Sequence, residues 1–364
     1  MEVKRIVLTV TTDLNFDQRM IRIASTLADT GYDVLLVGRQ RPTSLPLKDR
    51  SYRQKRLPCF FQKGIAFYAE YNFRLFFYLL WIRMDVICAI DLDTILPCYL
   101  VSLLRQKKRV YDAHELFCEM DEIVTRPRVY KVWKAIEKLC VPQFTFGYTI
   151  GEFYANEFQK EYGVTYQVVR NATVLQPYIP SQPTEKYILY QGAVNEGRSF
   201  ETLIPAMQHV DANMIVFGEG NFFSQAQSLA TEYKVTSKIQ FKGYIEPQFL
   251  KKFTQEAYIG ITLFTDRGKS NYLSLANRFF DYMHAGVPQL CMKYPEYEKI
   301  NSEFEVAILL EEPSVEKIVA ALHTLYTDTA LYTRLHENCL KARTLYCWQE
   351  QEKTLRTLYS SLLD

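Results

Sequence analysis

The chain has 364 residues and a formal net charge of +2 at pH 7, and 23% of its residues are charged. This length exceeds what one ordinary core organises and predicts two domains of about 150 to 180 residues each. The near balance of charge excludes a nucleic-acid-binding polycation and an acidic disordered chain, so we expect no nucleic acid partner.

Eight cysteines are scattered along the chain without a Cys-x-x-Cys pair. This distribution is typical of reduced core thiols in a reducing compartment. The first ten residues enter a strand pattern directly, where a secretion signal would have an apolar stretch and a cleavage site. The longest apolar run, near Leu75 to Ile82, is far short of the roughly 20 residues of a membrane span. We therefore expect a cytoplasmic protein.

The first half of the chain alternates short β-branched runs with helical patterns, as a parallel sheet does. A strand at residues 5–10, a helix at 17–30 and a strand at 31–37 come first. Further short apolar strands are predicted at residues 86–90, 109–111, 145–150 and 167–170.

A break in composition follows at residues 171–184, where Pro177, Pro180 and Pro183 favour extended backbone and predict an interdomain linker. A second alternating set begins at residue 187. It predicts strands at 187–190, 213–217, 239–241 and 259–263, with helices at 199–207 and 222–233. The sequence therefore predicts an α/β protein of two doubly wound parallel sheets, which bind ligands beyond the carboxyl ends of their strands.

Residues 271–288 predict a carboxylate on a short helix that opens from a polar loop. Asp281 is suited to accept both hydroxyl hydrogens of a ribose diol, and free backbone amides around Ser274 to Asn277 would face a diphosphate. Gly286 is expected to end the helix and Pro288 to prevent its continuation. The alternative is an amphipathic core helix on which Asp281 is merely solvated and three apolar side chains are buried, those of Phe279, Phe280 and Met283.

The segment 190–199 runs from a strand end through Gly192 and Gly197 and delivers Arg198 beside a helix N-terminus. A guanidinium and free amides together make an anion site, although a loop with a solvated arginine has the same pattern. After the next strand, Gly218 and Gly220 form a Gly-x-Gly turn that permits close approach of backbone.

His114 and Glu115 follow a strand end in the first half. His114 could hydrogen-bond a sugar hydroxyl and Glu115 could orient it or the acceptor, whereas a structural histidine is the simpler alternative. We interpret Asp91 or Asp93 as the cap of a helix that begins near Thr94, and we expect no metal site.

Together these segments resemble family 4 of the glycosyltransferases, the retaining group with the GT-B architecture of two facing Rossmann-like domains and a deep interdomain cleft. The most specific match is Leu275-Ala-Asn277-Arg278-Phe-Phe-Asp281-Tyr-Met-His-Ala-Gly286-Val-Pro288. The segments Tyr111-Asp-Ala-His114-Glu115 and Asp17-Gln-Arg19-Met-Ile-Arg are also similar to that family.

The resemblance implies site residues. Asp281 would bind the ribose, Arg198 the diphosphate and His114 the donor sugar, with Glu115 beside it. Tyr244 and Ile245 lie where the family packs the nucleotide base. Further donor contacts are expected at Gly192, Gly218, Gly220, Ser274, Leu275, Asn277 and Arg278, and Arg19 is a further residue expected at the cleft.

Two positions depart from the family pattern. Leu273 stands where the family often has a first glutamate, and Ala193 stands where it often has an arginine. Compensating groups would be Arg278, Lys269 or Arg19. A catalytically inactive GT-B-like binding or scaffold module and a sugar-nucleotide epimerase therefore remain alternatives.

The implied function is retaining, metal-independent transfer of a hexose from a UDP- or GDP-linked donor, without a cofactor, to a glycan or lipid-linked acceptor in cell-surface polysaccharide or glycolipid assembly. We expect an acceptor-side domain at residues 1–176, a linker at 177–186 and a nucleotide-sugar domain at 187–345. A helix at 346–364 is expected to pack back toward the first domain.

Residues 50–63 are basic and aromatic, and Phe73, Phe76, Phe77 and Trp81 follow them. Such a segment favours peripheral attachment to an anionic membrane surface, at the inner face of the cell membrane. The alternative is a buried helix over residues 73–81 after a solvated or acceptor-binding loop.

Overall fold

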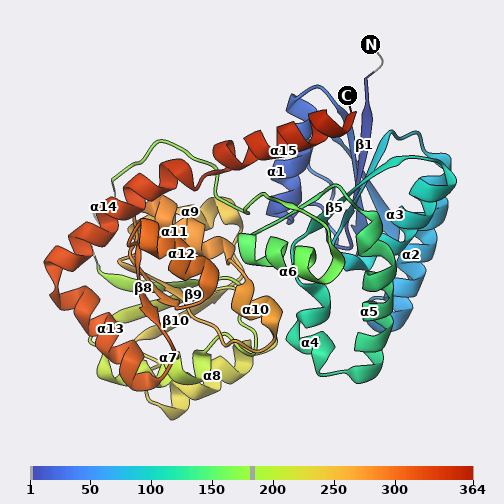
Figure 1. The fold of residues 1–364 in the computed structure, drawn as a ribbon. Coiled ribbons are helices and arrows are strands. Elements are labelled where there is room, and N and C mark those ends of the chain that lie inside the picture. The colour runs from blue at the N-terminus through green and yellow to red at the C-terminus, as the bar shows by residue number, and fades with distance from the viewer. Residues whose placement is uncertain (1–2, 181–184, 364) are drawn as a thin grey trace. The chain divides into compact units, whose positions relative to one another are not determined.

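The computed structural model describes residues 3–180 and 185–363 (Figure 1). The chain divides into two compact units, the first formed by Met1–Asn171 with Gln351–Asp364 and the second by Ala172–Glu350. The expected linker at 177–186 includes residues 181–184, which lie outside the described residues. The last residues of the chain belong to the first unit.

The first unit is built on a parallel seven-stranded sheet in the order β3-β2-β1-β4-β5-β6-β7. Every pairing in it is parallel. The strands are β1 (Arg5–Thr9), β2 (Asp33–Gln40), β3 (Arg53–Pro58), β4 (Val86–Ile90), β5 (Lys108–Ala113), β6 (Gly147–Thr149) and β7 (Gln167–Val168).

Helices cover this sheet (Figure 1). They are α1 (Gln18–Asp29), α2 (Gly64–Trp81), α3 (Leu92–Leu104), α4 (Asp121–Val124), α5 (Pro127–Cys140), α6 (Glu152–Tyr162) and α15 (Trp348–Leu363). Helix α3 packs against both α2 and α5. Helix α15 lies along α1, where the hydroxyl of Thr26 donates to Glu352 at 3.0 Å.

The second unit has a parallel six-stranded sheet in the order β10-β9-β8-β11-β12-β13. Its strands are β8 (Tyr187–Gln191), β9 (Asn213–Phe217), β10 (Ile239–Gly243), β11 (Ile259–Thr262), β12 (Gln289–Met292) and β13 (Ala307–Leu310). Its helices are α7 (Phe200–Ala206), α8 (Phe223–Glu232), α9 (Pro247–Glu256), α10 (Lys269–Leu273), α11 (Asn277–Ala285), α12 (Pro295–Glu303), α13 (Val315–Thr327) and α14 (Thr329–Leu345).

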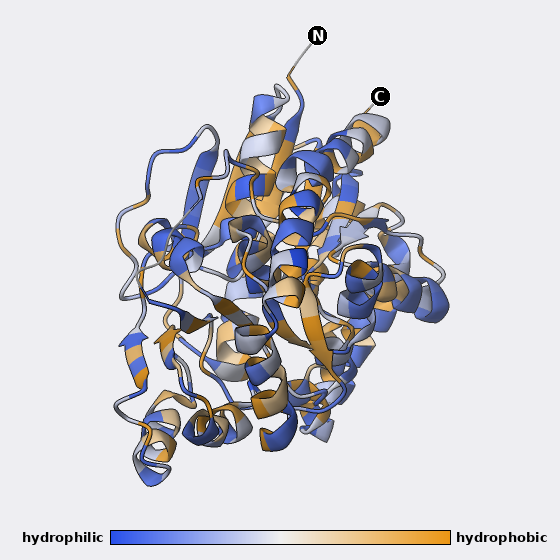
Figure 2. Ribbon diagram, turned by 90° about the vertical axis from the view of Figure 1, so that its left-hand side faces the viewer, coloured by the Kyte–Doolittle hydropathy of each residue, from blue (hydrophilic) through white to orange (hydrophobic). Residues whose placement is uncertain are grey.

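The central strands are mainly apolar because helices cover both faces of each sheet (Figure 2). All residues of β4 and β8 are buried. The eight cysteines are unpaired, and seven of them are buried in these cores. The predicted fold class, two doubly wound α/β sheets, is confirmed.

Two interpretations of the segment after residue 49 are wrong. The alternative of a solvated or acceptor-binding loop over residues 50–63 does not hold throughout, because these residues include β3, a mostly polar strand at the edge of the sheet. Residues 73–81 do form part of a helix, but Phe73, Phe77 and Trp81 are exposed on it and do not belong to the core. None of the helices that the structure describes is long and apolar enough to cross a membrane.

Candidate functional site

The loops after β8, β9 and β10 pack against one another at the carboxyl ends of these strands. The amide of Gly192 donates to the carbonyl of Phe217 at 3.0 Å, and the amide of Gly218 donates to that of Gly243 at 2.8 Å. A Cβ on Gly218 would lie 1.8 Å from the carbonyl oxygen of Gly192, so no side chain fits. The two glycines also have φ angles of 126° and 130°. They are therefore required by the approach of the loops.

Gly220 and Gly197 extend this loop cluster. A Cβ on Gly220 would lie 2.3 Å from the carbonyl oxygen of Val194, whose amide donates to Glu219 at 3.0 Å. The carbonyl of Gly197 accepts from the amide of Thr265, after β11, at 2.8 Å. Four strand ends thus converge on one backbone-lined surface.

Arg278, the second residue of α11, lies against this surface although only 8% of it is exposed. Its Nη1 is 3.3 Å from the Tyr190 hydroxyl and 3.3 Å from the Gln191 carbonyl oxygen. A Cβ on Gly192 would come within 3.0 Å of the same nitrogen. Its Nε and Nη2 are buried without a hydrogen-bond partner in the described protein. A buried cation in such surroundings is costly unless an anion accompanies it.

Two hydroxyl groups of the loops after β8 and β11 also lack hydrogen-bond partners in the described protein. The hydroxyls of Ser199 and Thr265 are buried and have no partner among the described residues. Arg198, immediately before Ser199, places its guanidinium carbon 5.6 Å from the centre of the Phe264 ring. Burial raises the pKa of Tyr297, whereas the charges of Arg278 and Arg198 both act to lower it, so both guanidiniums lie within electrostatic reach of that hydroxyl.

Asp281 is held in place by two neutral donors. Its Oδ1 accepts from the hydroxyl of Thr173 at 2.6 Å, and its Oδ2 accepts from the side-chain amide of Gln191 at 3.0 Å. The alternative, in which Asp281 is merely solvated, is therefore wrong. These bonds fix the direction of the carboxylate.

The expectation that the backbone amides before α11 are free is partly wrong. The amide of Ala276 donates to the Tyr297 hydroxyl at 2.7 Å, and the amide of Ser274 donates to the Asn271 carbonyl at 3.1 Å. Both are satisfied inside the protein, and Leu275 between them is buried. A diphosphate would have to be bound chiefly by side chains here.

The remaining expectations for this segment agree with the structure. Phe279, Phe280 and Met283 are fully buried, Asn277 is the first residue of α11, and Gly286 ends the helix with a φ angle of 73°. Leu273, where the family has a glutamate, is buried at the end of α10, which begins at Lys269.

Tyr244 and Ile245 follow β10 directly and differ in exposure. The Tyr244 ring is largely exposed, whereas Ile245 packs against a small core that includes Phe217. Since Gly243 is bonded to Gly218, Tyr244 follows directly on the glycine loop cluster. An exposed aromatic ring at this position is suited to stack on a base.

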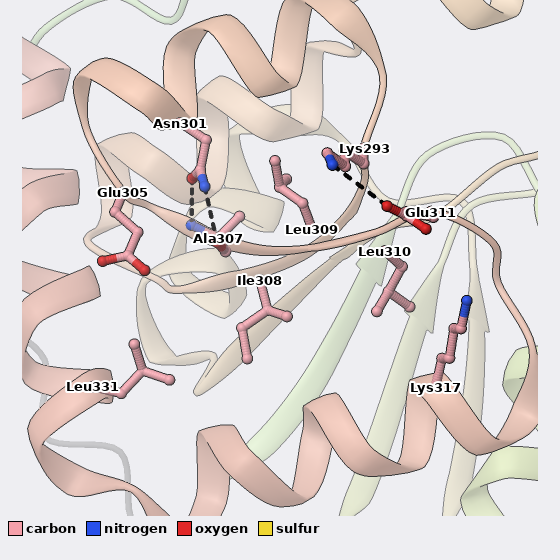
Figure 3. A pocket seen from close by; sticks show the side chains of 10 residues that line it. All are labelled: Lys293, Asn301, Glu305, Ala307, Ile308, Leu309, Leu310, Glu311, Lys317 and Leu331. Atoms are coloured by element: carbon pink, nitrogen blue, oxygen red, sulfur yellow. Dashed lines mark hydrogen bonds and ion pairs between the residues drawn. The ribbon is translucent and has the colours of Figure 1, made fainter.

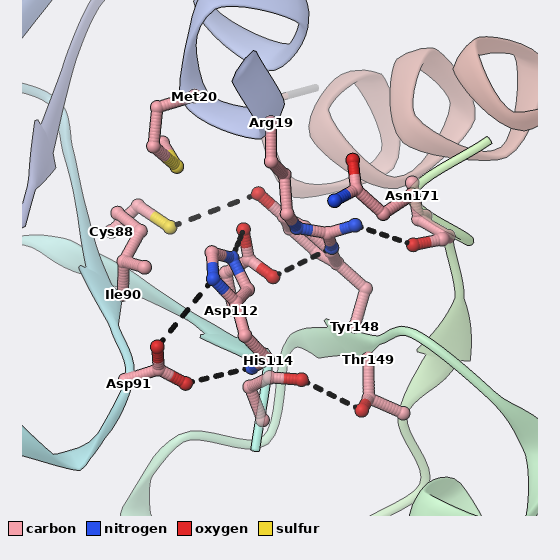
Figure 4. Close-up of polar contacts among 12 residues, drawn as sticks. Arg19, Met20, Cys88, Ile90, Asp91, Asp112, His114, Tyr148, Thr149 and Asn171 are labelled. Carbon is pink, nitrogen blue, oxygen red and sulfur yellow. Dashed lines mark hydrogen bonds and ion pairs between the residues drawn. The ribbon is translucent and has the colours of Figure 1, made fainter. Parts of the chain in front are cut away.

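In the first unit, His114 lies between two carboxylates just past the end of β5 (Figure 4). Its Nε2 is 2.9 Å from Oδ2 of Asp112, and its Nδ1 is 3.5 Å from Oδ2 of Asp91. Burial alone would lower the pKa of His114, but the two carboxylates raise it to about 9. The ring is therefore an imidazolium at neutral pH and cannot act as a general base there.

Arg19 completes this cluster from α1 (Figure 4). Its Nη2 donates to Oδ1 of Asp112 at 2.8 Å and its Nη1 to the carbonyl of Val169 at 2.9 Å. Arg19 is buried, so its observed role is to hold Asp112 rather than to present a guanidinium to a ligand.

The helix-capping interpretation of Asp91 and Asp93 is wrong. Asp91 does stand before α3, but its carboxylate makes no capping bond and accepts from the amides of His114 at 2.7 Å and Glu115 at 3.3 Å. Asp93 accepts from the Thr11 hydroxyl at 2.5 Å, and burial raises its pKa to about 7. The Glu115 carboxylate accepts from the Tyr154 hydroxyl at 3.4 Å. Within the described residues, no group of three or more His, Cys, Asp and Glu side chains is arranged to hold a metal ion.

The structure thus gathers the glycines, Arg278 and Tyr244 in the second unit, and His114, Glu115 and Arg19 in the first. Sequence inspection missed Asp112, Ser199 and Thr265 as members. Asp112 had a signal, because it directly follows the predicted strand at residues 109–111, two residues before His114, and alternate residues of extended backbone point to the same side. No sequence pattern indicated that Ser199 or Thr265 belongs to the site.

A pocket of about 530 Å³ in the second unit lies elsewhere, along the edge strand β13 (Figure 3). Asn301 already bonds the amides of Val306 and Ala307 at 2.8 and 3.0 Å. The pocket is also lined by lysines and glutamates, and Nζ of Lys293 lies 3.4 Å from Oε1 of Glu311. It does not involve the glycine loops.

The fold is similar to that of solved structures over nearly the whole chain. A sucrose-phosphate synthase from Thermosynechococcus elongatus matches with a TM-score of 0.80 and 15% identity, covering 99% of both chains. Anabaena Alr3699/HepE in complex with UDP matches with a TM-score of 0.74 and 11% identity, covering 99% of this chain and 100% of that one. WaaG, a glycosyltransferase involved in lipopolysaccharide biosynthesis, matches with a TM-score of 0.73 and 17% identity, covering 97% and 99%.

A search of curated protein sequences finds no match. The family model described as glycosyl transferases group 1 matches residues 175–342, which is nearly all of the second unit. This segment matches the group 1 glycosyltransferases, and the two parallel sheets of the chain have the GT-B fold.

Proposed function

We propose that the protein transfers a hexose from a nucleoside-diphosphate donor, UDP- or GDP-linked, to a glycan or lipid-linked acceptor, with retention and without a metal ion. The buried guanidinium of Arg278 carries this proposal. It lies against the glycine loops with two nitrogens that have no partner in the described protein. A diphosphate supplies oxygens that a guanidinium binds with two parallel hydrogen bonds.

Arg278 would also account for the departure at Ala193. That residue follows Gly192, against which Arg278 lies, so the missing arginine is replaced from another element. Arg198 adds a second cation within reach of the same Tyr297 hydroxyl. Two fixed positive charges stabilise the diphosphate as it gains charge on leaving, which is the task that a divalent metal has in other transferases.

The nucleoside would be held by Tyr244 against the base and Asp281 against the ribose. Asp281 is oriented by Thr173 and Gln191, so its carboxylate has a set direction. The crystal structure of the Anabaena protein contains UDP, which favours a uridine donor without deciding the sugar.

His114 would contact the donor sugar from the first unit. Both ring nitrogens face carboxylates, and the 3.5 Å contact to Asp91 is the weaker one. A sugar hydroxyl that replaced this contact would receive a hydrogen bond from an imidazolium, and Glu115 would take part in orienting the acceptor.

The test is titration calorimetry with UDP and GDP, followed by assay of nucleotide release from the matching sugar nucleotides. Release only in the presence of an acceptor supports transfer. Nucleotide binding without release under any acceptor would instead identify an inactive binding module, and absence of binding to both nucleotides would reject the proposal. Release without acceptor, with inversion at the sugar C2, would identify an epimerase.

A further inference from the structure

The outer surface of α2 carries a row of aromatic side chains in the first unit. Phe73 is 66% exposed and Trp81 86% exposed, with Phe77 between them. Positions four apart are neighbours on a helix surface. The row alternates with side chains two residues away that are buried in the first unit, namely Tyr71, Leu75 and Leu79. It therefore points away from the core along the helix.

A loop before α2 enlarges this surface. The amides of Phe60 and Phe61 both donate to the Glu70 carboxylate, at 2.9 and 3.0 Å, and Arg74 binds the same carboxylate at 2.8 Å. These bonds hold two more exposed aromatic rings beside the helix. The structure describes all of α2, and Glu70 is its one carboxylate. Its negative charge is paired with Arg74 and with the two loop amides.

Helix α5 adds positive charge on the same side of the sheet. It packs with α2 through Tyr68 and Trp133, whose rings are 5.3 Å apart, and α3 packs against both helices. Lys134 turns inward to glutamates, including Glu137 at 2.8 Å and Glu161 at 2.6 Å. The exposed side of α5 carries three cations, Arg128, Lys131 and Lys138.

We infer that this surface, formed by the aromatic row of α2 and the cations of α5, docks on an anionic lipid bilayer. Aromatic rings prefer the headgroup level of a membrane, and Lys and Arg beside them are attracted to anionic lipids. A second copy of the chain fits less well, because a two-fold interface sets the same surface against itself and would bring like charges together. The row lies on one side of its helix, as attachment in the interface requires, and no described helix can span a membrane.

Trp81 gives a direct test. The other two tryptophans, Trp133 and Trp348, are buried, so a change in emission on adding vesicles reports on Trp81. With phosphatidylglycerol vesicles we expect a blue shift and quenching by brominated lipid tails. With phosphatidylcholine vesicles both effects should be much weaker. An unchanged Trp81 emission with anionic vesicles would overturn the inference.

Flotation with the same vesicles tests the two components separately. Replacing Arg128, Lys131 and Lys138 by glutamine should lower partitioning about a hundredfold at low salt, because each cation near the surface contributes about fivefold. Phe73→Ser, Phe77→Ser and Trp81→Ser together should lower it as well, including at high salt. Both triple variants change exposed side chains, and unaltered melting temperatures would show that they fold.

The matched control removes the same charge from the second unit, with glutamine at Lys252, Lys317 and Lys341, and should float like the wild type. Equal loss in the control, or flotation without salt dependence, would contradict a specific docking surface. A dimer without lipid that the aromatic variant dissociates would show that a second copy covers the surface. None of these measurements needs donor or acceptor, so their failure and that of glycosyl transfer are separable.

Discussion

The two units bury charge in opposite ways. In the first, Arg19, Asp112, His114 and Asp91 form one cluster in which each cation faces a carboxylate. In the second, Arg278 is buried against a hydroxyl, a carbonyl and a tyrosine ring, and two of its nitrogens have no partner among the described residues. The first cluster balances its charges within the protein, although Nε of Arg19 also lacks a hydrogen-bond partner among the described residues. In the second unit no carboxylate balances Arg278, and an anion would stabilise it. The difference predicts opposite responses to removing a charge.

Asp112→Asn should have the largest effect on stability. The substitution keeps the size of the side chain but leaves Arg19 and His114 without their shared counter-ion, and breaking a buried ion pair in this way costs about 3 to 5 kcal/mol. Urea denaturation measures the change in the free energy of unfolding.

The control for that variant is Asp33→Asn. Asp33 also bonds two cations, Arg5 and Arg53, but its side chain is 26% exposed. Exposed ion pairs contribute about 1 kcal/mol or less. Equal losses in the free energy of unfolding would show that the buried cluster contributes no more to stability than the exposed ion pairs of Asp33.

Arg278→Met should affect binding rather than folding. Replacing a buried cation that lacks a carboxylate with an apolar side chain of similar length is expected to leave stability unchanged or slightly increased. Donor affinity should fall by about 3 kcal/mol, because two charge-assisted hydrogen bonds are lost. Calorimetry with UDP and GDP gives the affinity, and thermal melting gives the stability. A variant that melts early and binds normally would reverse our interpretation of the second unit.

The pH dependence of stability between pH 7.5 and 9 should come from His114 in the first unit. The pKa of His114 is raised from 6.5 to about 9 in the folded protein. Its stabilising contribution is therefore complete below pH 6.5 and is lost as the pH rises toward 9, by about 1.4 kcal/mol per unit. Asp93, with a pKa raised to about 7, has the same sign but loses its contribution at lower pH. Unfolding between pH 7.5 and 9 isolates the histidine, and His114→Gln should remove the slope.

The sequence predicted the parts of this comparison that local patterns encode. Strands buried on both faces and the glycine that ends α11 follow from apolar runs and backbone conformation, and their predicted ranges agree with the structure to within a few residues. The glycine loops were also recognised, since tight turns after strands require them.

The charge partners were not predictable in the same way. Arg19 and Asp112 are 93 residues apart, and nothing local says that a helix residue reaches that strand. Whether a buried arginine meets a carboxylate or a ring is decided by tertiary packing. Strand β3 was not predicted because an edge strand can be mostly polar. The exposed aromatic row of α2 was compatible with burial until the packing was known.

Asp281→Asn should produce the smallest effect and identifies which part of the donor this carboxylate binds. Asparagine keeps one acceptor oxygen, but its amide meets either the Thr173 hydroxyl or the Gln191 amide, so we expect a small loss of stability. If Asp281 binds the ribose, affinity for UDP should fall by about 1.5 kcal/mol, since the charged acceptor is lost. A dideoxy analogue without the ribose hydroxyls should bind the wild type and the variant equally. Such non-additivity assigns the contact, because independent changes would add. Equal losses for both nucleotides would place Asp281 in the supporting structure of the site rather than at the ribose.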